Sequence, residues 1–148
     1  MRKPLHTYLY IFVQILTTTA FSQAPNISFQ NMATLNAPVD VVNSLDNSGR
    51  LFIVEQRGYV RMYRNAGGLD PDTFLNLSNI ALYGGERGLL SIAFHPNYAT
   101  NRYFFVYYHN LAGDVTIARY RTSPINPDSA ASSSGHVLIN LPTLYTNP

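Results

Sequence analysis

The stretch Gly84-Gly85-Glu86-Arg87-Gly88-Leu89-Leu90-Ser91-Ile92-Ala93-Phe94-His95-Pro96-Asn97-Tyr98 is followed closely by Arg102-Tyr103-Phe104-Phe105-Val106-Tyr107-Tyr108. In order, these residues give a polar glycine-rich turn, a short apolar run, a Pro-Asn break and an aromatic run. Short apolar runs bounded by Gly, Pro and Asn are typical of β-strands that are buried on both faces. The stretch therefore predicts two consecutive strands of a β protein.

The chain beyond Pro38 continues the same pattern. Segments rich in β-branched or aromatic residues alternate with Gly, Pro, Asn, Asp or Ser, and no window after residue 22 carries a sustained helical apolar stripe. We predict an all-β fold. Its expected strands are Val39 to Val42, Leu51 to Glu55, Tyr59 to Arg64, Phe74 to Leu77, Leu89 to Phe94, Tyr103 to Tyr108, Val115 to Arg121 and Val137 to Leu141.

Two strand pairs resemble each other, which favours a β-propeller over a β-sandwich. A repeat of about 50 residues with a strand pair in each unit is typical of propeller blades. A sandwich would also show cleaner alternation of apolar and polar residues than the aromatic run does. The first part of the alignment matches Arg50, Phe52 and Val54 with Arg102, Phe104 and Val106. The second part has a spacing three residues longer, and it matches Gly58, Val60, Met62 and Arg64 with Gly113, Val115, Ile117 and Arg119.

The N-terminus predicts export. Arg2 and Lys3 precede an apolar run that is too short to span a bilayer, and Ala20-Phe21-Ser22 has the small-x-small pattern of a cleavage site. The alternatives are a membrane anchor and a buried helix. We expect a signal peptide at residues 1–22, cleaved after Ser22, then a leader at 23–36, and a periplasmic or secreted protein without membrane attachment after cleavage.

Charge and residue types exclude several functions. The ten Lys plus Arg include Arg2 and Lys3, so the mature chain has eight cationic and eight anionic side chains. This balance argues against a nucleic-acid partner. The mature chain has no lysine, and the whole chain has no cysteine. Schiff-base chemistry, a P-loop lysine, thiolate catalysis and cysteine-based metal sites are therefore excluded within it.

Several blocks, in this order and spacing, resemble the soluble quinoprotein glucose/sorbosone dehydrogenases, with hedgehog-interacting-protein-like propellers as non-enzymatic relatives. The resemblance implies a six-bladed β-propeller, of which residues 37–148 resemble the first two blades and the start of a third. Besides the opening stretch, the blocks are Gly49 to Gln56 with Gly58 to Arg61, Phe74 to Ser78, Val115 to Arg121 with Asn126-Pro127-Asp128, and Val137 to Pro142.

The chemistry that the resemblance implies is oxidation of a sugar. Pyrroloquinoline quinone (PQQ) with calcium accepts hydride from C1 of the sugar, a histidine takes the hydroxyl proton, and a separate electron acceptor reoxidises the cofactor. In the resembling enzymes this histidine lies in an Asn-His-x-Gly-Gly block after the strand that matches Val137 to Leu141. We expect it beyond Pro148, so no catalytic residue is expected in this chain, and most cofactor ligands are expected later still.

Glu86 is the one residue here that the resemblance places near the cofactor, where characterised enzymes commonly have a glutamine. An ionised glutamate accepts hydrogen bonds but cannot donate them, and it would repel the anionic quinone. The alternative is a structural salt bridge between Glu86 and Arg87. Glutamate at this place also resembles the hedgehog-interacting relatives.

The other ionisable residues carry weaker signals. Among the histidines, His6 belongs to the signal, His95 resembles a turn cap, His109 closes a strand and His136 starts one; none has zinc-ligand spacing, so no metal site is expected. Glu55 has two interpretations, a channel-facing group or a buried carboxylate paired with an arginine.

Three functional hypotheses follow: part of an exported PQQ-dependent aldose dehydrogenase, a non-catalytic carbohydrate- or protein-binding propeller, and a self-contained small β domain. Two open blades would expose apolar strands, which argues against the third hypothesis. We therefore expect residues 23–148 alone to aggregate or stay poorly ordered, and to show no turnover.

Overall fold

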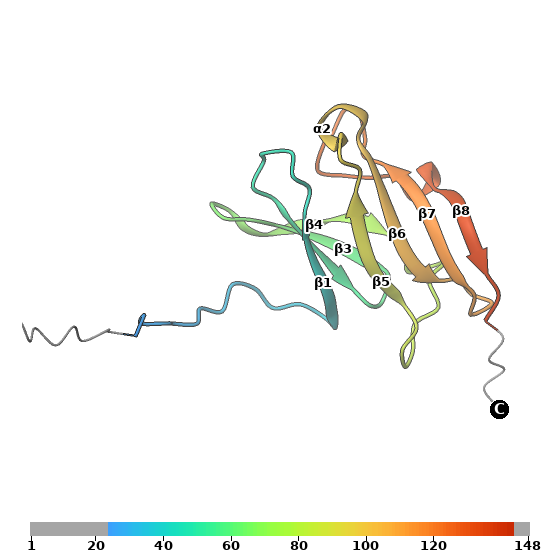
Figure 1. Ribbon diagram of the computed structural model, residues 1–148, viewed down its shortest axis with the longest axis horizontal. Helices are drawn as coiled ribbons and strands as arrows, with labels where there is room; N and C mark the ends of the chain where they lie inside the picture. Colours follow the sequence, from blue (N-terminus) through green and yellow to red (C-terminus); the bar gives the residue numbers. More distant parts are fainter. Residues whose placement is uncertain (1–23, 144–148) are drawn as a thin grey trace, which may run out of the picture. The chain divides into compact units, whose positions relative to one another are not determined.

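Eight strands form two antiparallel sheets in the computed structural model, which describes residues 24–143 (Figure 1). The chain divides into two units, Met1–Gln30 and Asn31–Pro148, and every strand belongs to the second. Residues 24–35 carry no regular secondary structure. The expected signal peptide at 1–22 and the expected start of a third blade lie outside the described residues.

The first sheet contains β1 to β4 in sequence order: β1 (Pro38–Asn43), β2 (Leu51–Glu55), β3 (Tyr59–Arg64) and β4 (Gly68–Asn76). All four strands were predicted, but β4 begins earlier than expected. Gly68 and Leu69 pair with Arg64 and Tyr63, and the register shifts in this pair make room for Pro71, which cannot donate to the ladder.

The second sheet repeats this order with β5 (Leu89–Phe94), β6 (Tyr103–His109), β7 (Val115–Arg121) and β8 (His136–Leu141). A short helix, α2 (Tyr98–Asn101), joins β5 to β6, and a 3-10 turn, η1 (Ser132–Ser134), precedes β8. Two consecutive four-stranded antiparallel sheets are the arrangement of adjacent propeller blades, so the predicted fold class is confirmed.

The second half of the internal repeat was aligned wrongly. Phe52 pairs with Met62 in the first sheet, and its equivalent Phe104 pairs with Tyr120 in the second, so Met62 corresponds to Tyr120 and not to Ile117. A slip of three residues moves a side chain to the opposite face of a strand. Ile117 accordingly lies on the half-buried face of β7 and not on its core face. The reason is that the β6–β7 hairpin is longer than the β2–β3 hairpin of the first sheet.

The core lies between the sheets and is rich in aromatic side chains. Phe74 lies between Phe52 and Phe104, with ring centroids 4.7 Å and 5.3 Å away, and the Phe104 ring stacks on Tyr120 at 5.9 Å. Burial raises the pKa of Tyr120 to about 12. Ser91 of β5 also donates a hydrogen bond of 2.7 Å to Asp40 of β1. These contacts stack the two sheets as one unit.

Antiparallel pairing gives this two-sheet unit two ends. The β2–β3 turn, the β4–β5 loop and the β6–β7 turn lie at one end, which we call the cleft end (Figure 1). The β1–β2, β3–β4, β5–β6 and β7–β8 connections lie at the other, which we call the network end. The candidate functional residues divide between these two ends.

Candidate functional site

The cleft end holds a cleft of about 510 Å³ between the β4–β5 loop and the β6–β7 turn. This volume lies within the usual range of small-molecule sites. Glu86, the residue singled out from the sequence, is among its lining residues, which are Gly84, Gly85, Glu86, Arg87, His109, Gly113 and Thr143. Side chains of three chemical kinds, a carboxylate, a guanidinium and an imidazole, therefore meet around one opening.

Hydrogen bonds with Gln56 hold the β4–β5 loop in place. The Gln56 side-chain amide donates to the backbone carbonyl of Gly85 at 2.7 Å and to that of Arg87 at 3.1 Å. The backbone carbonyl of Gln56 accepts from the Leu89 N–H at 3.0 Å. Gly88 lies so close that a Cβ atom there would overlap the Gln56 carbonyl. The first sheet thus fixes the loop that carries Glu86 and Arg87.

Glu86 and Arg87 are both exposed, and no ion pair joins them in the part of the chain that the structure describes. The alternative explanation of Glu86 as one half of a salt bridge that pins the loop is therefore wrong. The loop is held by Gln56 instead, and both charged side chains are available to a ligand. The assignment of Glu86 to the cofactor stays a prediction.

His109 is the buried member of the cleft. It ends β6, and its backbone is fixed on both sides, since its N–H donates to Gly88 at 3.0 Å and its carbonyl accepts from Leu82 at 2.8 Å. The residue is only 9% exposed, and its Nδ1 is buried without a hydrogen-bond partner. The sequence indicated only that this residue closes an aromatic strand.

The remaining singled-out residues have structural surroundings. His95 caps the turn before α2 as predicted, because its Nδ1 accepts from the Asn97 backbone at 3.0 Å and lies 2.8 Å from the Asn101 amide. His136 is exposed at the start of β8. Glu55 is buried, but it accepts from the Asn36 backbone at 2.7 Å, and no arginine pairs with it among residues 24–143.

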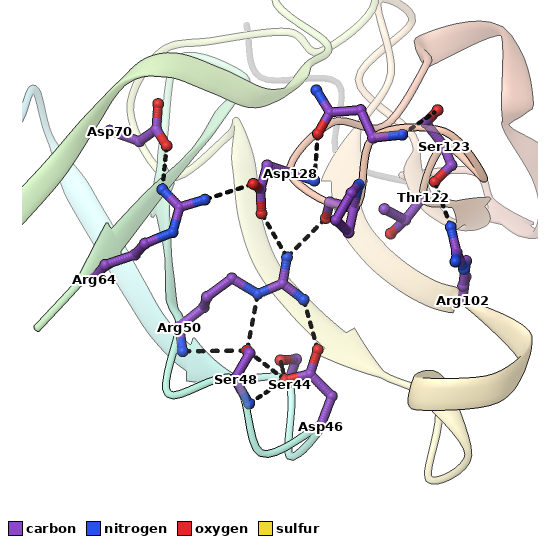
Figure 2. Close-up of polar contacts among 12 residues, drawn as sticks. Ser44, Asp46, Ser48, Arg50, Arg64, Asp70, Arg102, Thr122, Ser123 and Asp128 are labelled. Atoms are coloured by element: carbon purple, nitrogen blue, oxygen red, sulfur yellow. Dashed lines mark hydrogen bonds and ion pairs between the residues drawn. The ribbon is translucent and has the colours of Figure 1, made fainter. Parts of the chain in front are cut away.

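At the network end, Arg50 joins the two sheets through charged hydrogen bonds (Figure 2). Its Nη2 lies 2.5 Å from Asp46, and its Nη1 lies 2.8 Å both from Asp128 and from the Pro127 carbonyl. Its Nε donates to Ser48 at 2.8 Å. Every guanidinium nitrogen is paired, so this buried cation is fully satisfied.

A second arginine extends this network. Arg64 reaches the other Asp128 oxygen at 2.6 Å and also pairs with Asp70. Asp128 lies in the β7–β8 connection, whereas Arg50 directly precedes β2 and Arg64 ends β3, so Asp128 ties the second sheet to the first. The sequence predicted none of these pairs. Those with Asp128 join residues far apart in the chain, whereas Asp46–Arg50 and Arg64–Asp70 are local.

The network changes the ionisation of its carboxylates. Burial alone would raise the pKa of Asp46, but hydrogen bonds from Ser48, Ser44 and Arg50 outweigh it and hold that pKa well below its usual range. The hydrogen bond from Arg64 likewise lowers the pKa of Asp70. These carboxylates stay ionised at neutral pH as structural anions.

Among residues 24–143, no group of three or more His, Cys, Asp or Glu side chains is arranged to hold a metal ion. Within the same range, none of the helices has both the length and the apolar character that crossing a bilayer requires.

The chain is similar to known proteins in both sequence and fold. A family model described as Glucose / Sorbosone dehydrogenase matches residues 35–140. Among curated proteins, Hedgehog-interacting protein from Mus musculus is 44% identical over 81 residues, which are 52% of this chain and 12% of that protein. The Homo sapiens protein is 42% identical over 78 residues, covering 50% and 11%.

Solved structures show the same fold at lower identity. The PQQ-bound aldose sugar dehydrogenase of Streptomyces coelicolor matches with a TM-score of 0.61 and 20% identity, over 75% of this chain and 32% of that chain. The soluble aldose sugar dehydrogenase of Escherichia coli in its apo form gives 0.59 and 20%, over 77% and 33%. The chain thus spans about a third of these structures and about an eighth of the curated relatives.

Proposed function

Because the chain belongs to the glucose/sorbosone dehydrogenase family, we propose that it is part of a PQQ-dependent dehydrogenase that oxidises the C1 hydroxyl of an aldose. The family match over residues 35–140 carries this proposal. The two-blade fold supports it, since blades of this kind occur in the PQQ-bound neighbour. The sugar is the proposed substrate, and a separate electron acceptor is the proposed partner.

The cleft fits one side of a site for an anionic quinone. Arg87 can donate to a cofactor carboxylate, and the unpaired nitrogen of His109 indicates that this part of the cleft accommodates a polar group. Bound there, PQQ would supply the electrophile that accepts hydride. Glu86 fits less well, because an ionised carboxylate repels an anion. We propose that calcium binds together with PQQ, and that the calcium ligands come from later parts of the protein.

The residues of this chain would bind and orient, and would not carry out the proton transfer. Gln56 fixes the loop that presents Glu86 and Arg87, and the Gly88 and Leu82 contacts fix His109 beside it. The proposed catalytic histidine belongs to the block expected beyond Pro148. Residues 37–148 are the proposed propeller segment, with residues 1–22 as export signal and 23–36 as leader.

Reconstitution tests this proposal. The full-length protein is loaded with PQQ and calcium, and dye reduction is measured with a panel of aldoses. We expect cofactor binding and aldose-dependent reduction. If Glu86 contacts the quinone, Glu86→Gln should tighten PQQ binding several-fold, because it removes a like charge; Asp72→Asn, an exposed carboxylate at the network end, is the matched control. Equal PQQ affinity in all three proteins would remove Glu86 from the cofactor site.

A non-catalytic carbohydrate- or protein-binding propeller is the second candidate. The observation that favours it is the 44% identity to Hedgehog-interacting protein, which exceeds the 20% identity to the aldose sugar dehydrogenases. A well-folded full-length protein that binds neither PQQ nor calcium would support this candidate and contradict the dehydrogenase.

A further inference from the structure

The unpaired nitrogen of His109 is unusual within this chain. Among buried side-chain nitrogen and oxygen atoms of the described residues, only His109 Nδ1 and Arg61 Nε lack a partner. Arg61 still donates through Nη2 to the Asp70 carbonyl at 2.9 Å. For the His109 ring, by contrast, the structure gives no hydrogen bond within residues 24–143. A buried polar atom without a partner destabilises the native state unless something outside the fold satisfies it.

The position of His109 shows where such a partner would come from. The residue is 91% buried, yet it is among the residues that line the cleft. Its backbone is held by Gly88 and Leu82, and its ring packs edge-on to Tyr107, at an interplanar angle of 67° with centroids 5.9 Å apart. The imidazole is therefore held in one place at the edge of an open cavity, which suits a group that recognises a ligand.

Charged groups around His109 are also left without partners in the described chain. Arg87 is exposed and makes none of the ion pairs found among residues 24–143. It lies over the β6–β7 turn, since a Cβ atom added at Gly113 would lie 3.6 Å from its Nη1 and 3.7 Å from the Thr143 hydroxyl. An exposed guanidinium with no ion pair can turn toward a ligand.

We propose that His109 is a specificity-determining residue of this cleft, where its imidazole hydrogen-bonds a hydroxyl group of a neutral polyhydroxy ligand. The mixture of groups selects this chemistry: Glu86 accepts and Arg87 donates, as adjacent hydroxyl groups require. The Thr143 hydroxyl donates to the Gly113 carbonyl at 2.7 Å, so towards a ligand it can accept. This inference rests on the proposed function for the identity of the ligand as a sugar.

The substitution His109→Phe tests the role of the ring nitrogens. It keeps a flat ring against Tyr107 and removes the unpaired polar atom, so the melting temperature without ligand should be at least that of the parent. In the full-length protein, D-glucose affinity measured by calorimetry should fall about tenfold, the loss expected for one hydrogen bond. His136→Phe makes the same change at an exposed position and should leave both quantities unchanged.

A second pair of variants, His109→Gln and His109→Leu, keeps the test valid if His109→Phe does not fold. His109→Gln keeps a hydrogen-bonding group and should retain more glucose affinity than His109→Phe or His109→Leu. Glucose affinity equal to the parent in His109→Phe, or equal in His109→Gln and His109→Leu, would overturn the proposal. So would a lower melting temperature of His109→Phe with unchanged affinity, because that result makes the ring purely structural.

The proposed function and this inference can fail separately. Glucose binding that depends on His109, without dye reduction, would contradict the dehydrogenase and support the cleft assignment. Dye reduction with the same KM in parent and His109→Phe would support the dehydrogenase and contradict the cleft assignment. A KM raised about tenfold with kcat retained would support both.

Discussion

The two ends of this two-sheet unit handle their polar groups in opposite ways. At the network end, Arg50 is 7% exposed and each of its guanidinium nitrogens has a partner, and all four ion pairs found among residues 24–143 lie there. At the cleft end, His109 is 9% exposed and its Nδ1 has none. The two residues are buried to a similar extent, so the difference is whether their polar side-chain atoms have hydrogen-bond partners.

This difference assigns stability to the network end and ligand binding to the cleft end. Paired buried charges hold loops in a single arrangement, whereas unpaired buried polar atoms raise the free energy of the folded protein until a ligand binds. Functional sites commonly carry such a cost, and the rest of the structure supports it. Arg50 and Asp128 therefore belong to the scaffold that holds the cleft, although they lie at the opposite end.

The largest expected effect comes from breaking the network at its centre. Arg50→Met leaves the partly buried Asp46 without its cation and releases Asp128, and the free energy of unfolding should fall by about 3 kcal/mol, the lower end of the range for buried pairs that lose one partner. Denaturant unfolding of the full-length protein measures this loss. Glucose affinity of the fraction that remains folded should not change.

Arg64→Met is the matched control. The Arg64 side chain is 37% exposed, so its ion pairs are screened by solvent and the expected loss is about 1 kcal/mol or less. Similar losses in the two variants would contradict the distinction between a buried centre and an exposed rim.

A smaller effect is expected from pH. The pKa of Asp46 is lower in the folded protein than in the unfolded chain, so its contribution to stability is full above the unfolded value of about 4 and is lost as pH falls through the folded value. Asp46→Asn should therefore be less stable than the parent at pH 7, and this difference should shrink as pH falls below about 4. A difference in unfolding free energy that stays constant from pH 7 to pH 2 would show that the Asp46 charge contributes nothing.

The fold was largely predictable because strand signals are local. Apolar segments bounded by turn residues located all eight strands, and the run from Leu89 to Phe94 is present with those limits. The register of the repeat was not predictable, because hairpin length depends on pairing across the sheet. For this reason Ile117 was aligned with the core residue Met62, whose equivalent in the second sheet is Tyr120.

The site was less predictable, because it depends on contacts between distant segments. The resemblance identified Glu86, and the structure places this residue on a cleft. It could not show that Gln56 holds the loop, that Glu55 is bound by the Asn36 backbone, or that His109 lacks a partner. The only signal for His109 in the sequence is a polar residue that ends an apolar strand.

Hydrogen exchange of the full-length protein with and without D-glucose tests the division between the two ends most directly. We predict that the ligand slows exchange in residues 84–88 and 109–114 and leaves residues 44–50 and 123–129 unchanged. Slower exchange at 44–50 and 123–129 only, or no change at 84–88 and 109–114 at saturating ligand, would contradict the account.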